Sequence, residues 1–149
     1  MPVGKICNRD VVVVKKDESV QAAALLMRRY HVGDLVVVEE GRGRRVPVGI
    51  LTDRDIVIET LAEDVNIEEL TIGDIMSLDL VTVNEDEDVI DAIEMMRAKG
   101  IRRVPVVDRS GALVGIVTVD DLIELFAEVI GDIAKLITHE QKREKEKRK

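Results

Sequence analysis

The sequence predicts an α/β (α+β) protein built from two β-α-β-β-α repeats that pack sheet to sheet around a pseudo-two-fold axis. Three observations lead to this fold. The chain repeats itself, each copy alternates short β-branched runs with amphipathic segments, and the runs are too apolar for a sheet with one face in water. A unit of about 60 residues buries little surface alone, so the two copies are expected to cover each other.

The repeat is visible when the sequence is laid over itself. With an offset of 69 residues, Val3–Val38 aligns with Ile72–Val107, and 13 of the 36 positions are identical. With an offset of 66, Pro47–Val57 aligns with Leu113–Ile123, and five of eleven positions are identical. The divisions expected from this alignment are residues 1–64 for repeat 1, 65–71 for a linker, 72–130 for repeat 2, and 131–149 for a helical extension and a basic tail.

Each copy is expected to begin with a strand, at 10–14 and 79–83, where β-branched residues dominate. An amphipathic helix follows, with apolar residues at i, i+3, i+4 and i+7 and with Asp17 or Asp86 as its N-cap. Glycine-containing turns then predict a hairpin of two further strands in each copy. The expected hairpin strands are 35–40 and 47–51 in the first copy and 103–108 and 113–117 in the second.

A second helix is expected to open at a motif that both copies share. "GILTDRD" (49–55) and "GIVTVDD" (115–121) each place a threonine three residues before an aspartate. This spacing is close to that of a capping box, in which the two side chains satisfy the first backbone N–H groups of a helix. The same side chains can also hold a ligand, because a carboxylate offers two acceptor oxygens to a vicinal diol. The motif alone leaves both interpretations open.

Composition excludes several classes of function. The net charge is −8, and since the last eight residues contribute +4, the remainder carries −12. So acidic a body argues against a nucleic-acid surface, and the only aromatic residues, Tyr30 and Phe126, make base-stacking platforms improbable. The two histidines lack metal-ligand spacing, and no nucleophile elbow or phosphate-binding loop is present, so neither a metal site nor catalytic residues are expected.

The location of the protein is also expected from composition. Cys7 is the only cysteine, which fits a reducing compartment. The chain has no apolar core of a signal peptide at its start and no apolar run of roughly 20 residues that could span a bilayer. A cytoplasmic protein without membrane contact is therefore expected.

Two tandem units of this kind, each with Gly-apolar-x-Thr-x-x-Asp after its last strand, resemble a cystathionine-β-synthase (CBS) domain pair. The resemblance covers roughly Val3 to Ile130 and includes "GIRRVPVVD" (100–108) before the second motif. It implies that adenosine-containing ligands (AMP, ADP, ATP or S-adenosylmethionine) bind in clefts between the repeats. An adenine nucleotide would then be a regulatory ligand, with no required cofactor and no catalysis.

The resemblance also assigns residues. The aspartate that accepts both ribose hydroxyls corresponds to Asp55 and Asp121. The hydroxyl residue near the ribose and phosphate corresponds to Thr52 and Thr118. The other binding residues that it implies are Val12, Val81, Thr82 and Pro105 around the base, and Arg102 and Arg103 toward the phosphates.

The two copies differ near these positions. Where the second copy has Arg102 and Arg103, the first has Gly33 and Asp34. A carboxylate beside a phosphate is unfavourable, so we expect two unequal sites, with the phosphates in the cleft that the arginines face. Because Asp34 belongs to the same copy as Thr52, we expect the Thr52 motif to serve the weaker site, although sequence does not say which motif the arginines serve.

The C-terminal segment is expected to form a partner surface. Its apolar stripe continues past the end of the repeat, although Gly131 within it argues against one continuous helix. Homodimerisation through helices is what the family resemblance implies, and the basic tail is expected to be solvated or to meet an acidic partner. The stripe consists of Leu122, Phe126, Val129, Ile130, Ile133, Leu136 and Ile137.

The function expected from these features is that of a homodimeric sensor of adenine nucleotides that regulates an unidentified protein partner. The alternative is an interaction module whose clefts are empty or purely structural. A nucleotide-processing enzyme is a third and weaker alternative, because no acid, base or nucleophile set stands out.

Overall fold

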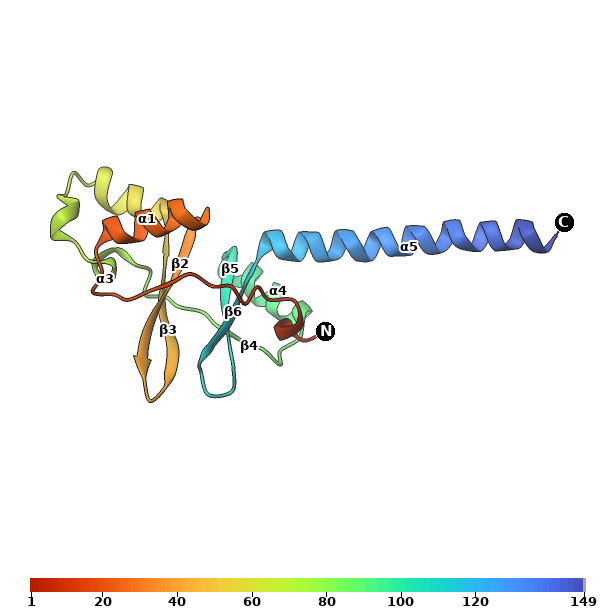
Figure 1. Cartoon of the computed structure of the whole chain (residues 1–149), viewed down its shortest axis with the longest axis horizontal. Helices are drawn as coiled ribbons and strands as arrows, with labels where there is room; N and C mark the ends of the chain where they lie inside the picture. Colours follow the sequence, from red (N-terminus) through yellow and green to blue (C-terminus); the bar gives the residue numbers. More distant parts are fainter. Residues whose placement is uncertain (149) are drawn as a thin grey trace.

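Two halves of similar construction make up the body of the molecule, and one long helix projects from it (Figure 1). The computed structural model describes residues 1–148. Each half contains a three-stranded sheet, with strand orders β1-β2-β3 and β4-β5-β6. In both sheets the first pair of strands is parallel and the second pair is antiparallel. The predicted fold class is confirmed.

The elements follow the same order in both halves. A 3₁₀ turn, η1 (Val3–Lys5), precedes them. The first half contains β1 (Val13–Val14), α1 (Val20–Tyr30), β2 (Asp34–Gly41), β3 (Arg44–Thr52), α2 (Asp53–Ile56) and a π-helical turn, η2 (Val57–Leu61). The connection contains η3 (Ile67–Glu69) and α3 (Ile72–Ile75). The second half contains β4 (Val83–Asn84), α4 (Val89–Lys99), β5 (Arg103–Val107), β6 (Leu113–Thr118) and α5 (Val119–Lys147).

The first strand of each half is much shorter than predicted. Strands were expected at 10–14 and 79–83, but the ladders cover only two residues each, β1 and β4. The β-branched composition of these runs reflects burial, because Val14 and Val83 are core residues. Extended chain that packs against a core needs the same apolar residues as a paired strand, so the pattern overestimated the ladder.

The predicted N-caps of the amphipathic helices were wrong by two residues. The α1 N-cap is Ser19, whose Oγ accepts a hydrogen bond from the Ala22 N–H at 3.0 Å. The α4 N-cap is Asp88, whose Oδ1 accepts from the Ile90 N–H at 2.9 Å. Asp86, the predicted cap of α4, instead accepts from the Arg109 side chain. Several short polar residues precede each helix, and only backbone geometry selects the one that caps.

The two sheets pack against each other through a small apolar cluster. Val36 and Val38 of β2 and Ile116 of β6 are buried in it. All four central residues of β2, 35–38, are buried, so both faces of this strand are covered. This matches the expectation that strands without apolar–polar alternation lie between two layers.

The chain segments that lead into the two halves are exchanged. Val3 lies in the core of the second half, with Val83 and Val104, and the backbone N–H of Gly4 donates to the carbonyl of Glu85. Conversely, Ile72 lies in the core of the first half. In Figure 1 the N-terminus accordingly lies beside α4, and α3 lies beside α1. Each folded half therefore contains a segment from the other sequence repeat.

Helix α5 is continuous across Gly131, although this glycine argued against one continuous helix. An added Cβ at Gly131 would meet no atom within 4 Å, so this residue serves no close approach. Every described residue from 132 to 148 is exposed, and the basic segment is helical as far as Lys147. In residues 1–148 no helix is both long enough and apolar enough to cross a bilayer.

Candidate functional site

Both Thr-x-x-Asp motifs form complete capping boxes. At α2, the Thr52 hydroxyl accepts from the Asp55 N–H at 3.0 Å, and Asp55 Oδ2 accepts from the Thr52 N–H at 2.9 Å. At α5, the corresponding bonds between Thr118 and Asp121 measure 3.2 and 3.0 Å. In each box the aspartate accepts through Oδ2 alone, and its Oδ1 remains a second acceptor. Capping therefore leaves room for ligand binding by the same carboxylate.

A third capping box shows that the motif alone does not make a site. Thr71 and Asp74 have the same spacing at the start of α3, where Asp74 Oδ2 accepts from the Thr71 N–H at 2.9 Å and from the Thr71 hydroxyl at 3.1 Å. Neither residue lines the cavity described below. What distinguishes Thr52 and Asp55 is the surface that lies opposite them.

The glycine of each motif lets another segment of chain cross the last strand. An added Cβ at Gly49 would lie 2.9 Å from Met76 Sδ and 3.0 Å from the Ser77 carbonyl oxygen. At Gly115 it would lie 2.6 Å from Cys7 Sγ. The crossing segments pair with the strands, since the Ser77 N–H donates to the Ile50 carbonyl at 3.0 Å. The motif glycines thus bring the exchanged segments against the threonine ends of β3 and β6.

A cavity of about 410 Å³ lies between Thr52 and the second half of the chain. This volume falls within the range of small-molecule sites. The end of β3 and the start of α2 form one wall. The other wall is formed by residues 77–81 and 101–103. The lining residues are Ile50, Thr52, Asp53, Arg54, Asp55, Ser77, Asp79, Leu80, Val81, Ile101, Arg102 and Arg103.

The two arginines line the same cavity as Thr52. Arg103 is the first residue of β5 and lies opposite Thr118 in the strand register, and Arg102 directly precedes it. Both nevertheless line the cavity with Thr52 and Asp55. The sequence left open which motif the arginines serve, and the structure places them with Thr52, the motif expected to serve the weaker site. This cavity therefore combines the motif of one copy with residues at a strand start of the other copy.

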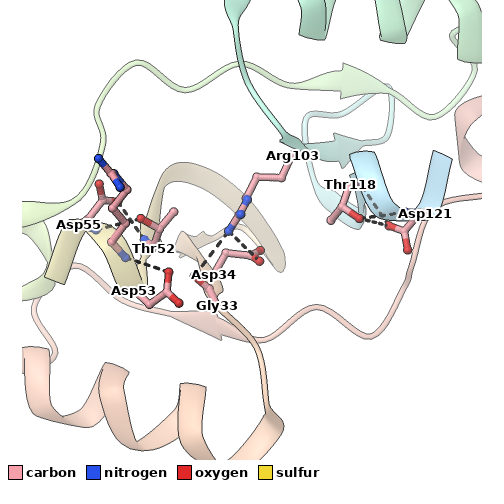
Figure 2. Close-up of polar contacts among 9 residues, drawn as sticks. Gly33, Asp34, Thr52, Asp53, Asp55, Arg103, Thr118 and Asp121 are labelled. Carbon is pink, nitrogen blue, oxygen red and sulfur yellow. Dashed lines mark hydrogen bonds and ion pairs between the residues drawn. The ribbon is translucent and has the colours of Figure 1, made fainter. Parts of the chain in front are cut away.

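Arg103 forms a salt bridge with Asp34, its counterpart in the first repeat. Arg103 Nη1 lies 3.0 Å from Asp34 Oδ1, and both side chains are largely buried, at 28% and 21% exposure. Figure 2 shows this pair between the two capping boxes, with Thr52 and Asp55 on one side and Thr118 and Asp121 on the other. Arg102 is by contrast exposed and lies 4.0 Å from Asp120.

The surroundings of Asp34 favour the neutral, protonated form of its carboxyl group. Burial raises the pKa of Asp34 above its ordinary value, and the carboxylates of Asp53 and Asp121 raise it further. The Arg103 guanidinium opposes this rise in pKa but does not overcome it. The cavity at Thr52 is basic at the edge that Arg102 and Arg103 line.

The other residues implied by the family resemblance are placed as follows. Val81 lines the cavity. Val12, its counterpart, is half-buried and accepts a hydrogen bond on its carbonyl from the Val36 N–H at 3.1 Å. Pro105 occupies the position of Val36, is buried in β5, and cannot donate the corresponding bond to Val81 because it has no N–H. Thr82 is exposed, and neither Thr82 nor Pro105 lines the cavity.

Several cavity residues were not predicted from sequence. Arg54 lies inside the first motif, and Ser77 and Asp79 lie in the exchanged segment. Asp79 is identical to Asp10 in the repeat alignment, which was the one available signal. The exchange that brings residues 77–79 to Thr52 is invisible in the repeat itself, so their role could not be read from the motif.

Comparison with known proteins identifies the family of this chain. The CBS domain model matches residues 3–62 and 72–128. A CBS domain-containing protein of Bacillus subtilis, YhcV, is 36% identical over 132 residues, which are 87% of this chain and 90% of that protein. An uncharacterized protein of Methanopyrus kandleri is 38% identical over 131 residues, and the match covers 88% of this chain but only 65% of the relative.

Related sequences also occur inside a larger enzyme, and a related structure holds ligands. Inosine-5'-monophosphate dehydrogenase of Methanocaldococcus jannaschii is 33% identical over 121 residues, which are 80% of this chain and 22% of the enzyme. The solved CBS domain pair of protein MJ0100, in complex with 5'-methylthioadenosine and S-adenosyl-L-methionine, is 31% identical with a TM-score of 0.74. That match covers 86% of this chain and 97% of the neighbour.

Proposed function

This chain belongs to the CBS-domain family, and we propose that it is a regulatory module that binds an adenosine-containing nucleotide in the cavity at Thr52 and Asp55. The observation that carries the proposal is the combination of the Asp55 carboxylate on one wall of this cavity with the guanidinium groups of Arg102 and Arg103 on the other. The ligand-bound MJ0100 pair supports the adenosine class. The proposed ligand is AMP, ADP or ATP, with S-adenosylmethionine as the alternative.

The polar groups of the cavity suit the ribose and the phosphates. Asp55 Oδ2 is used by the capping bond, and we assign the remaining acceptor capacity of the carboxylate to the two ribose hydroxyls. Thr52 would lie beside the ribose and the first phosphate. Arg102 and Arg103 supply planar donor pairs that match phosphate oxygens. Arg54 adds a third guanidinium to this cavity.

The adenine base would occupy the apolar part of the cavity. Ile50, Leu80, Val81 and Ile101 line it without any aromatic residue. Because Pro105 has no N–H, the Val81 carbonyl receives no bond corresponding to that between Val36 and Val12. We assign this carbonyl to the exocyclic amino group of adenine. Val81 and Pro105 would thus act through the backbone.

The second cleft, at Thr118 and Asp121, is proposed to bind a different kind of adenosine ligand. Gly33 and Asp34 stand there in place of the arginines, and Asp120 lies in the first turn of α5. Phosphates would be repelled by these carboxylates. An uncharged or cationic ligand such as 5'-methylthioadenosine or S-adenosylmethionine would fit this charge, with Val12 near its base.

Regulation would follow from the position of the ligand between the halves. A nucleotide in the cavity contacts β3 and α2 of one half and residues 77–81 and 101–103 of the other. A ligand that prefers one arrangement of the halves shifts the population toward it. We propose that this shift is read by an unidentified protein partner and that the protein is a non-catalytic homodimer in the cytoplasm, where its single cysteine stays reduced.

The experiment that tests this function is calorimetric titration of the full chain with AMP, ADP, ATP, S-adenosylmethionine and 5'-methylthioadenosine. Binding of at least one phosphorylated nucleotide, lost on Asp55→Ala, supports the proposal. No binding of any adenosine compound would favour the alternative of an interaction module with structural clefts. Turnover of a nucleotide by the purified protein would instead indicate an enzyme.

A further inference from the structure

The outer part of α5 is an exposed helix with one apolar face. Ile133 and Leu136 are 56% and 64% exposed. The spacing of the stripe at three and four residues places it on a single side of the helix. A projecting helix gains little stability from its own hydrogen bonds, and contiguous apolar surface of this kind marks an interaction site. The exposed stripe is Phe126, Val129, Ile130, Ile133, Leu136 and Ile137.

This stripe continues a groove on the body of the molecule. The groove lies between α4 and α5, has a volume of about 580 Å³, and is lined almost entirely by apolar side chains. Phe126 and Ile130 belong to both the groove and the stripe. One continuous apolar surface therefore runs from the body to the middle of the projecting helix.

The charges along α5 are divided between its two ends. Residues 119–132 contain five acidic and no basic side chains. Residues 142–148 contain five basic and two acidic side chains and no apolar ones. Arg143 follows Leu136 by seven residues, and Lys147 follows Ile133 by fourteen, so both lie on the side of the apolar stripe.

We propose that α5 pairs in antiparallel orientation with α5 of a second copy of this chain. The inference rests on the proposed homodimer and assigns its surface and direction. Antiparallel pairing about the middle of the stripe brings the basic end of each helix beside the acidic first turns of the other. Parallel pairing would set basic end against basic end and acidic end against acidic end, which is unfavourable.

The same charge division disfavours an anionic membrane as the occupant. The apolar stripe lies along the acidic part of α5 and ends before residue 142, where the basic residues begin. A membrane-binding helix needs its basic residues beside its apolar face. In α5 the stripe instead shares its length with the carboxylates of Glu124, Glu128 and Asp132, and residues 119–132 contain no basic side chain.

Cysteine cross-linking tests the orientation. In a Cys7→Ser background, Ile133→Cys places a thiol near the centre of the stripe and Lys147→Cys places one at the end. Antiparallel pairing holds the two copies of residue 133 close together and the two copies of residue 147 about 42 Å apart along the helix axis. A short bismaleimide should therefore cross-link the Ile133→Cys protein and leave the Lys147→Cys protein monomeric on a denaturing gel. Cross-linking of both variants would show a parallel pair and overturn the inference.

The mass in solution separates this inference from the proposals on which it depends. Light scattering should show that the wild-type chain is a dimer. The dissociation constant of this dimer should rise at least tenfold in Ile133→Asp and stay unchanged in Thr138→Asp, because Thr138 lies off the stripe. A dimer that Ile133→Asp leaves intact would overturn the α5 surface but keep the homodimer. A monomeric wild-type chain would overturn both the α5 surface and the homodimer, whether or not the chain binds phosphatidylserine vesicles. Calorimetry of AMP binding tests the cavity independently of these results.

Discussion

Arg103 and Asp34, which occupy the same position in the two sequence repeats, form a 3.0 Å salt bridge with each other across the interface between the halves. Each begins the central strand of its sheet and lies opposite a motif threonine, Thr118 or Thr52, in the strand register. A duplicated position has thus acquired opposite charges. This charge difference is the basis of our proposal that the two motifs bind different ligands.

Arg103→Ala is expected to weaken the binding of phosphorylated ligands selectively. Loss of a charge-assisted hydrogen bond costs about 1.5–3 kcal/mol, or roughly 10- to 100-fold in affinity. Calorimetry should show this loss for AMP or ATP and a much smaller change for adenosine. Arg109→Ala is the matched control, because Arg109 pairs with Asp86 outside the cavity. Equal loss with both variants would contradict the assigned role of Arg103.

Asp34→Asn is expected to strengthen binding of phosphorylated ligands in the cavity. The Asp34 carboxylate holds Arg103 at 3.0 Å and repels phosphate. Its removal frees the guanidinium, and a gain of about 1 kcal/mol corresponds to roughly fivefold in affinity. Asp86→Asn removes an exposed carboxylate and should leave AMP affinity unchanged. Weaker AMP binding by Asp34→Asn would show that the salt bridge positions Arg103 for the ligand.

The pH dependence of stability provides an independent measure of Asp34. Burial and neighbouring carboxylates raise its pKa from the ordinary value of 3.8. The folded protein therefore binds more protons than the unfolded chain between the two pKa values, and the contribution of Asp34 to the unfolding free energy falls as pH rises through this window. Subtracting the Asp34→Asn denaturation curve from that of the wild type should show this fall above pH 3.8. A contribution that grows with pH would mean that Arg103 controls the titration.

Substitution of the motif glycines should destabilise the fold at the crossings. Gly115→Ala places a methyl group 2.6 Å from Cys7 Sγ and 2.9 Å from the Asn8 carbonyl oxygen. Overpacking of this kind costs about 1–3 kcal/mol, which should appear as a lower midpoint of thermal unfolding. Gly41→Ala is the control, since nothing lies within 4 Å of its added Cβ. If the two variants unfold alike, the crossing at Gly115 is not tightly packed.

The fold was predictable from sequence because the repeat and the burial pattern agree. Continuous apolar runs such as Leu35–Val38 identify strands with two covered faces, and the glycine turns identify the hairpins. The same patterns misplaced local details. Ser19 and Asp88 cap their helices instead of the acidic residues two positions earlier, because capping depends on where the backbone turns.

The site was predictable only as a set of residues. Thr52 and Asp55 follow from the motif, and Arg102 and Arg103 follow from the family resemblance. Their meeting in one cavity depends on the pseudo-two-fold packing and on the exchange of residues 70–77 into the first half. An alignment of two repeats records which positions are equivalent, but it does not record which copy supplies each wall of a cleft.

The most direct test compares two aspartates with the same capping role. Asp55 and Asp74 each close a Thr-x-x-Asp capping box, but only Asp55 lines the cavity. Replacement by alanine should cost each protein about 1 kcal/mol of stability through the lost cap. AMP or ATP at 100 times its dissociation constant should then stabilise the wild type and Asp74→Ala by about 2.7 kcal/mol, and Asp55→Ala not at all. Equal stabilisation of both variants would contradict nucleotide binding at Asp55.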